Sequence, residues 1–211
     1  MTVGAGEFIE VWLFLAANIA SPGPNVLNTI ALAMGSGRAA GLGSATGVGL
    51  GIGLWCLGMT LGVATLLALV PGAARVMTWA AVGLLVWFAL RYLRAAWAGW
   101  QARGMQVPKG RDGAGFATGF RRSLMVNALN PKALTSWLAV LAMFPVARAT
   151  GADIALLCVG ACLLSFGIHT AYVLTFSTPV ALRFYLRAGW VLQAAACLLF
   201  LGFALRLVAG A

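Results

Sequence analysis

Two short segments combine proline with polar side chains inside otherwise apolar stretches. Residues 18–25 read Asn-Ile-Ala-Ser-Pro-Gly-Pro-Asn, and residues 127–132 read Asn-Ala-Leu-Asn-Pro-Lys. A proline within a helix lacks an N–H group and clashes with the carbonyl four residues earlier. The prolines should therefore interrupt two helices and free the carbonyls of Asn18, Ala20 and Asn127. A free carbonyl in hydrocarbon costs several kcal/mol, so each break must be buried in protein or line a wet cavity.

The two breaks favour the binding of a small zwitterion. Ser21 and Asn130 each directly precede a proline, as a capping residue precedes a proline at the first helical position. A helix that restarts there points its positive end at the break and attracts an anion such as a carboxylate. The freed carbonyls suit an ammonium group, and an amino acid carries both groups. The other interpretation is that Pro-Gly-Pro merely kinks a packing helix. The candidate substrate-binding residues are Asn18, Ser21, Pro22, Gly23, Pro24, Asn25, Asn127, Asn130, Pro131 and Lys132.

Lys132 and His169 are the ionisable side chains that we expect near the breaks. A lysine at the centre of a spanning helix costs about 2.5–3.5 kcal/mol on insertion scales. Lys132 should therefore face the bundle interior, where it can hold a carboxylate, or else extend to the membrane surface. His169 is the only histidine in the chain. Because histidine titrates near neutrality, His169 is a candidate for proton coupling, although it could equally be a satisfied core residue.

One face of the fifth apolar stretch carries Cys158, Cys162, Ser165 and His169. Cysteine and histidine are ligands for soft metals, so a heavy-metal path is an alternative for this face. A polar inner face without metal is the simpler interpretation, and we expect neither a metal site nor a cofactor.

The second apolar stretch carries a stripe of glycines at helical spacing. Small residues at such spacing let helix backbones approach closely, so the stripe predicts a packing face and also permits a homodimer. The stripe consists of Gly43, Gly47, Gly51, Gly58 and Gly62.

The composition requires a membrane protein to hold these segments. Of the 211 residues, 62% are hydrophobic and 9% are charged, against roughly 45–50% and 25% in soluble domains. The apolar residues fall into runs long enough for spanning helices, which need about 20 residues each. We therefore predict one all-α domain over residues 1–211, a bundle of six transmembrane helices in a lipid bilayer. The runs are roughly 8–34, 40–69, 73–98, 119–146, 153–177 and 189–209.

The positions of the two breaks predict an internal repeat. Pro22 and Pro131 lie 109 residues apart, close to half the chain, and three spans separate them. An odd number of spans makes the two halves enter the membrane from opposite sides, which is typical of a 3+3 inverted repeat. The halves would cover about 1–98 and 119–211, joined by a cytoplasmic loop at 99–118, with helices 1 and 4 interrupted by proline. Only a few residues match, so chance similarity is the alternative.

Charge sets the expected orientation. The net charge is +10, and most basic residues fall on one side if the 99–118 loop is cytoplasmic, which places both termini outside. The first apolar run has no basic segment before it, so we interpret it as a span and not as a signal peptide.

Features of soluble catalysis are missing from the sequence. No carboxylate pair lies within a span, and no phosphate-binding Gly-x-x-x-x-Gly-Lys-Ser/Thr motif is present. The sequence therefore predicts neither an enzyme nor direct use of ATP. The basic charge is better explained by anionic lipid than by nucleic acid.

The motifs around the two breaks resemble those of a known family. Residues 21–27 (Ser-Pro-Gly-Pro-Asn-Val-Leu) and 37–42 (Gly-Arg-Ala-Ala-Gly-Leu) are similar to the amino-terminal signature of the lysine exporter (LysE) superfamily. Residues 127–133, followed by Phe144 and Pro145, resemble its second signature. The resemblance covers nearly the whole chain and is closest to the RhtB-like homoserine/threonine exporter branch.

The resemblance implies a secondary exporter of an amino acid or a derivative in a bacterial-type inner membrane, driven by the proton gradient without a bound cofactor. Residues 22–25 and 130–132 match the two motifs by position. Many relatives have an acidic residue and then a histidine where this chain has Ile52 and Trp55. This departure leaves the proton-coupling group open and directs attention to His169 or to the carboxylates near the outer ends, Glu7, Glu10 and Asp153. A heavy-metal cation exporter of the same superfamily is the alternative function.

Overall fold

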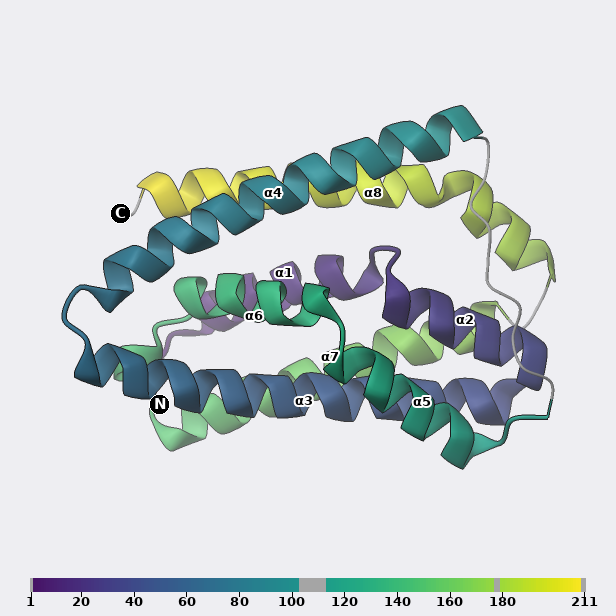
Figure 1. The fold of residues 1–211 in the computed structure, drawn as a ribbon, viewed down its shortest axis with the longest axis horizontal. Coiled ribbons are helices and arrows are strands. Elements are labelled where there is room, and N and C mark those ends of the chain that lie inside the picture. The colour runs from purple at the N-terminus through teal and green to yellow at the C-terminus, as the bar shows by residue number, and fades with distance from the viewer. Residues whose placement is uncertain (1, 103–112, 177–178, 210–211) are drawn as a thin grey trace.

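The chain folds as a helical bundle in the computed structural model, which describes residues 2–102, 113–176 and 179–209 (Figure 1). Those residues contain eight α-helices, one short 3-10 turn and no strand. The fold is therefore all-helical, as the sequence predicts. The helices are α1 (Ala5–Ala20), α2 (Pro24–Ser36), α3 (Arg38–Leu69), α4 (Ala73–Ala102), α5 (Phe116–Ala128), α6 (Pro131–Met143), α7 (Gly151–Thr175) and α8 (Pro179–Ala209), and the 3-10 turn η1 (Val146–Arg148) precedes α7.

An order of two short helices followed by two long ones occurs twice. Helices α1 and α2 have 16 and 13 residues and precede α3 and α4, with 32 and 30 residues. Helices α5 and α6 have 13 residues each and precede α7 and α8, with 25 and 31 residues. The start of α1 and the end of α8 lie at one end of the bundle, and the end of α4 and the start of α5 lie at the other (Figure 1).

Four of the helices are long and apolar enough to cross a membrane. Their candidate spans have mean hydropathies of 1.5 to 2.1. Many of their large apolar side chains face outward, among them Leu61, Trp79 and Leu198, as expected of surfaces in contact with hydrocarbon. The spans are Arg38–Val63, Arg75–Gln101, Gly151–Thr175 and Arg187–Ala209.

Two helix ends differ from the sequence expectation. The sequence leaves residues 178–188 between the last two apolar stretches, but those from Pro179 onward lie within α8. Proline is tolerated at the first position of a helix, so α8 can begin at Pro179. Arginine is a good helix former, so Arg183 and Arg187 do not end the helix. Helix α4 also extends beyond the predicted apolar stretch, through Gly99 to Ala102. Residues 103–112 of the predicted loop lie outside the described residues.

The short helices α1 and α6 lie between two sets of longer ones. Helix α4 packs along α8, and α3 packs along α5 and α7, while α6 contacts both α1 and α4 (Figure 1). Aromatic side chains join α1, α4 and α8. The ring of Phe200 lies 5.4 Å from that of Phe14, 5.6 Å from that of Phe88 and 5.2 Å from that of Tyr92. These contacts hold the buried Tyr92 ring against α8.

The glycine stripe of α3 is a packing face over its first half. A Cβ atom at Gly43 or Gly47 would clash with the backbone of α5, and one at Gly51 would clash with the Asn127 side chain. No neighbouring atom lies within 4 Å of the corresponding position at Gly58 or Gly62. The predicted packing role is therefore confirmed for the first three glycines and not for the last two.

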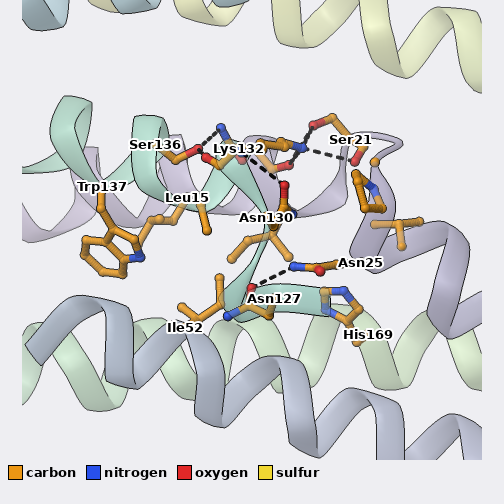
Figure 2. Close-up of a pocket in the computed structure, with 16 residues that line it drawn as sticks. Leu15, Ser21, Asn25, Ile52, Asn127, Asn130, Lys132, Ser136, Trp137 and His169 are labelled. Carbon is orange, nitrogen blue, oxygen red and sulfur yellow. Dashed lines mark hydrogen bonds between the residues drawn. The ribbon is translucent and has the colours of Figure 1, made fainter. Parts of the chain in front are cut away.

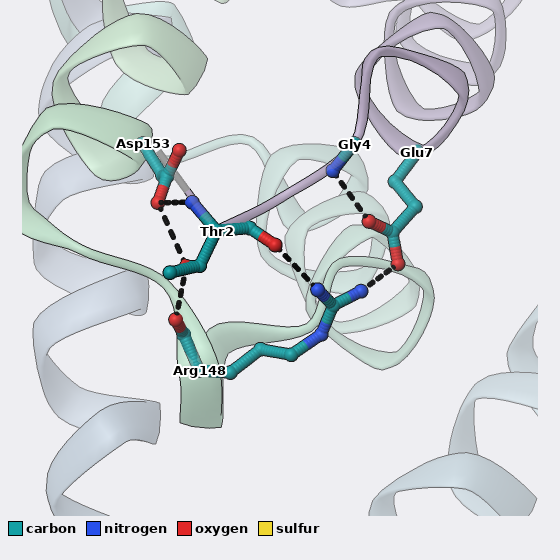
Figure 3. A network of polar contacts seen from close by, with 5 residues as sticks. All are labelled: Thr2, Gly4, Glu7, Arg148 and Asp153. Atoms are coloured by element: carbon teal, nitrogen blue, oxygen red, sulfur yellow. Dashed lines mark hydrogen bonds and ion pairs between the residues drawn. The ribbon is translucent and has the colours of Figure 1, made fainter.

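A polar network joins the N-terminal segment to the start of α7 (Figure 3). The Thr2 N–H and hydroxyl each donate to Asp153 Oδ2 at 3.1 Å. Arg148 donates to the Thr2 carbonyl and forms an ion pair with Glu7 of α1. Asp153 and Thr150 also cap α7 reciprocally. The network thus connects the first and second sets of helices at one end of the bundle.

Candidate functional site

The first break lies between α1 and α2. Helix α1 ends at Ala20, and α2 begins at Pro24 with Gly23 as its N-cap residue. The sequence reading that Ser21 caps a helix restarting at Pro22 is therefore wrong. The residue before a proline is disfavoured in the helical region, so Pro24 keeps Gly23 extended and the helix restarts only after it.

The second break lies between α5 and α6. Helix α5 ends at Ala128, and α6 begins at Pro131. The side chain of Asn130 accepts a hydrogen bond from the Lys132 N–H at 3.0 Å, which confirms Asn130 as the helix cap. This cap directs the first turn of α6, and with it Lys132, toward the first break.

Each carbonyl that the prolines free is satisfied by a side chain from another helix. The Asn18 carbonyl accepts from Lys132 Nζ at 2.7 Å. The Ala20 carbonyl accepts from the Tyr172 hydroxyl of α7 at 2.5 Å. The Asn127 carbonyl accepts from Trp55 Nε1 of α3 at 3.3 Å. The predicted cost of the breaks is thus offset by three side chains that lie far away in sequence, and at Asn127 also by the Asn130 N–H, which donates to the same carbonyl at 3.2 Å.

Lys132 reaches from the second break into the first (Figure 2). Besides the Asn18 carbonyl, its ammonium group donates to Ser21 Oγ at 2.9 Å and to the Ser21 carbonyl at 3.5 Å. It also lies 5.4 Å from the centre of the Tyr92 ring. The Tyr92 hydroxyl lies 2.6 Å from Ser21 Oγ. We call these four groups, the Asn18 carbonyl, the Ser21 carbonyl, the Ser21 hydroxyl and the Tyr92 ring, the ammonium cage.

The two breaks border one cavity of about 30 Å³. This volume admits about two or three water molecules, which need roughly 10–15 Å³ each on this measure, but not an amino acid. Every candidate residue except Pro22 and Pro131 lines it, and so does His169. The side chain of Pro131 is outside the described part of the structure. Apolar residues complete the wall: Leu15, Ile19, Val26, Ile52, Ala133 and Trp137.

The cavity has a second polar region away from Lys132 (Figure 2). Asn25 Nδ2 donates to Asn127 Oδ1 at 2.8 Å, which joins α2 to α5. Three buried polar atoms here have no hydrogen-bond partner in the structure: Asn25 Oδ1, Asn127 Nδ2 and His169 Nε2. Unpaired buried polar groups are costly, so this region suits a polar ligand or water.

His169 presents one ring nitrogen to the cavity. Its Nδ1 lies 2.9 Å from the Ser165 carbonyl, an acceptor, so Nδ1 carries the proton. The lone pair of the neutral ring is then on Nε2. A group in the cavity can therefore donate a hydrogen bond, or a proton, to Nε2.

Tyr92 and Ser136 belong to the site but were not among the sequence candidates. Ser136 Oγ accepts from Asn18 Nδ2 at 2.9 Å and donates to the Lys132 carbonyl at 2.5 Å. Ser136 stands four residues after Lys132, a helical spacing that could have identified it. Tyr92 lies in an apolar span with no local pattern that marks it.

The residues considered for a heavy metal are directed to different places. Cys158 Sγ lies 2.7 Å from Cys56 Sγ, and Cys162 Sγ donates to the Gly49 carbonyl at 3.0 Å. His169 lines the cavity instead. Within the described ranges, no group of three or more His, Cys, Asp or Glu side chains is placed to hold a metal ion.

Comparison with known proteins finds one family whose model covers most of the chain. A family model described as LysE type translocator matches residues 16–210. No curated protein and no solved structure matches the sequence.

Proposed function

We propose that this chain, which belongs to the LysE type translocator family, is a secondary active exporter of an amino acid or an amino-acid derivative. The chain is a multi-pass membrane protein, and we place it in the inner membrane with both termini outside. The signature residues around the breaks favour the RhtB-like branch of the family. The observation that carries the proposal is the cavity between the two breaks, lined by an ammonium group, backbone carbonyls and unpaired polar atoms.

We further propose that the two short helices in each set make one crossing. At 1.5 Å per residue, a 13-residue helix is about 20 Å long and cannot span a hydrocarbon core of about 30 Å. Together α1 and α2 have 16 and 13 residues, or roughly 44 Å, which is sufficient. With the four long helices this makes six crossings. The repeated order of short and long helices supports an inverted repeat with both breaks at the same depth.

The chemistry of the cavity fits a zwitterion. Carbonyl oxygens that a proline has freed accept from an ammonium group, while Lys132 can pair with a carboxylate. The start of α2 at Gly23 and Pro24 lines the same cavity and adds the positive end of a helix. His169 Nε2 is the group that we assign to proton coupling. Because the cavity admits only water as it stands, loading requires the paired short helices to separate.

The test is accumulation of labelled neutral amino acids in everted membrane vesicles under an imposed proton gradient. Lys132→Ala and Pro22→Ala should each lower the initial rate by about tenfold or more, a change of roughly 1.4 kcal/mol. The matched control is Lys109→Ala, which removes the same charge from the other lysine of the chain. If the unmodified chain accumulated no amino acid, the proposal of export would be refuted. If Lys132→Ala and Pro22→Ala both kept the unmodified rate, the proposed binding site would be refuted.

A further inference from the structure

We propose that the ammonium cage is a subsite for a primary ammonium group, which Lys132 fills in this structure and the α-ammonium group of the substrate takes over on binding. This inference rests on the proposed function for its second half. Its first half, the recognition of an ammonium group by the cage, stands on the structure alone.

The cage matches a primary ammonium group in number and kind of contacts. An ammonium has three N–H donors and no acceptor. The cage offers three oxygen acceptors, at 2.7, 2.9 and 3.5 Å from Lys132 Nζ, and one aromatic face. Cations bind over a tyrosine ring within about 6 Å of its centre. None of these groups carries a charge, so the cage recognises the ammonium by hydrogen bonds and ring electrostatics and not by ion pairing.

The rest of the cavity makes the occupant exchangeable. Among the described lining residues, Lys132 is the only charged side chain. Its position across Gly23, where a Cβ atom would lie 3.4 Å from Nζ, shows that the side chain fills space at the entrance of α2. Because the remaining cavity of about 30 Å³ is too small for an amino acid, the substrate can enter this position only when the lysine side chain moves out.

Exchange of one ammonium group for another avoids leaving the carbonyls of the cage without their hydrogen-bond donor. If Lys132 left the cage empty, the Asn18 carbonyl would keep only the Ser21 hydroxyl as a donor and the Ser21 carbonyl would lose the lysine as a donor, and lost hydrogen bonds to buried carbonyls are costly. A substrate ammonium restores those bonds as the lysine leaves. The flexible lysine stem then lets its charge follow the carboxylate of the same substrate. In the empty carrier the ammonium group of Lys132 thus occupies the cage, and in the loaded carrier the ammonium group of the substrate occupies it.

The chemical class of substrate follows from this exchange. A free primary ammonium group next to a carboxylate is required. An N-acylated amino acid cannot replace the lysine, because its amide nitrogen has one donor and no charge. The same holds for a hydroxy acid or a dicarboxylate without an amine.

The first experiment tests the cage without transport. Lys132→Ala removes the atoms from Cγ to Nζ, which correspond to n-propylammonium. Purified Lys132→Ala protein should gain about 5 °C or more in thermal unfolding midpoint with saturating n-propylammonium. Neither n-propanol with this variant nor n-propylammonium with the unmodified chain or with Lys109→Ala should produce that gain. If the variant is recovered unfolded, the same comparison is made on its yield of folded protein when the amine is present during extraction. Equal effects of amine and alcohol, or no effect of either, would overturn the proposal.

The second experiment tests the exchange in vesicles of the unmodified chain. An unlabelled amino acid should compete with the labelled substrate, and its N-acetyl form should compete at least about tenfold less well. Equal competition by the N-acetyl form would overturn the exchange and leave export intact. Amine rescue of Lys132→Ala without any amino-acid accumulation would refute the proposed function and leave the cage intact, so the two failures are distinguishable.

Discussion

At the scale of single residues, the breaks are stabilised by donors that come from elsewhere in the chain. Lys132, Tyr172 and Trp55 each provide a hydrogen bond to a carbonyl that lost its helical partner to a proline. Each donor comes from a different helix. The breaks are therefore held by side chains, and single substitutions should change their stability or their function separately.

Tyr172→Phe should destabilise the protein more than Tyr92→Phe. In the first variant the Ala20 carbonyl loses its side-chain donor, which should cost about 1–3 kcal/mol. In the second variant the Ser21 hydroxyl keeps contacts with the Asn18 carbonyl and Lys132, so the cost should be about 1 kcal/mol or less. Thermal unfolding of the purified variants measures the difference. An equal loss in both would mean that the Ala20 carbonyl finds another donor.

His169→Gln should separate exchange from accumulation. Glutamine can form hydrogen bonds at this position but cannot take up a proton. Exchange of labelled for unlabelled amino acid across the membrane, without a gradient, should stay close to that of the unmodified chain. Accumulation driven by a proton gradient should fall by about tenfold or more if His169 carries the proton. Cys162→Ala, a change on the same helix, is the control. Equal losses in the two assays would assign His169 a structural role instead.

At the scale of helices, proline and glycine decide where backbones part and where they meet. Prolines separate α1 from α2 and α5 from α6, and glycines let α3 lie against α5. The reciprocal contact is made by Gly119 of α5, where a Cβ atom would clash with the backbone of Ala40. A similar approach occurs between α7 and α1, where Gly160 faces the ring of Trp12. Close crossings of this kind fix the short helices beside the long ones.

Gly47→Ala should therefore destabilise the protein, whereas Gly58→Ala should not. At Gly47 the added methyl group meets the backbone of Phe120, and the overpacking should cost about 1–3 kcal/mol. At Gly58 no neighbouring atom lies within 4 Å, so the change should be neutral or add about 0.5–1 kcal/mol through the helix preference of alanine. Thermal unfolding compares the two. A loss at Gly58 as large as at Gly47 would contradict this description of the α3–α5 contact.

The sequence predicts the features that depend on local chemistry and not those that depend on distant packing. The loss of a hydrogen bond at proline is a local property, so both breaks can be located from their motifs. The side-chain partners of the freed carbonyls lie 72 to 152 residues away in the sequence, and no local pattern marks Tyr92. The prediction that α2 begins at Pro22 is wrong because Pro24 follows two residues later. Either proline could begin a helix, and the extended backbone of Gly23 determines that Pro24 does.

At the scale of the molecule, the number of crossings depends on how the short helices are paired. The four long helices alone would make four crossings. Pairing α1 with α2 and α5 with α6 adds two crossings and brings both breaks to the middle of the bilayer. The polar network around Arg148 and Asp153 would then lie at the outer surface, together with the N-terminal segment.

Labelling of single cysteines can establish this topology. In a chain whose four native cysteines are replaced, an impermeant maleimide should label Thr2→Cys, Arg75→Cys and Ala149→Cys from outside intact cells. Ser36→Cys and Gly115→Cys should react only after the membrane is opened. If Thr2 and Ser36 were labelled from the same side, α1 and α2 would form a re-entrant pair and the six-crossing arrangement would be wrong.

Each break receives a side-chain hydrogen bond from the other half of the chain, and this has a consequence for synthesis. Ala20 and its donor Tyr172 are separated by 152 residues. At roughly 5–20 residues per second, a ribosome needs on the order of 8–30 s to make that length of chain. During this interval the nascent first half has no donor for the Ala20 carbonyl and must keep it in contact with water. Insertion into the bilayer is therefore complete only when late segments reach early ones, and neither half should mature when it is produced alone.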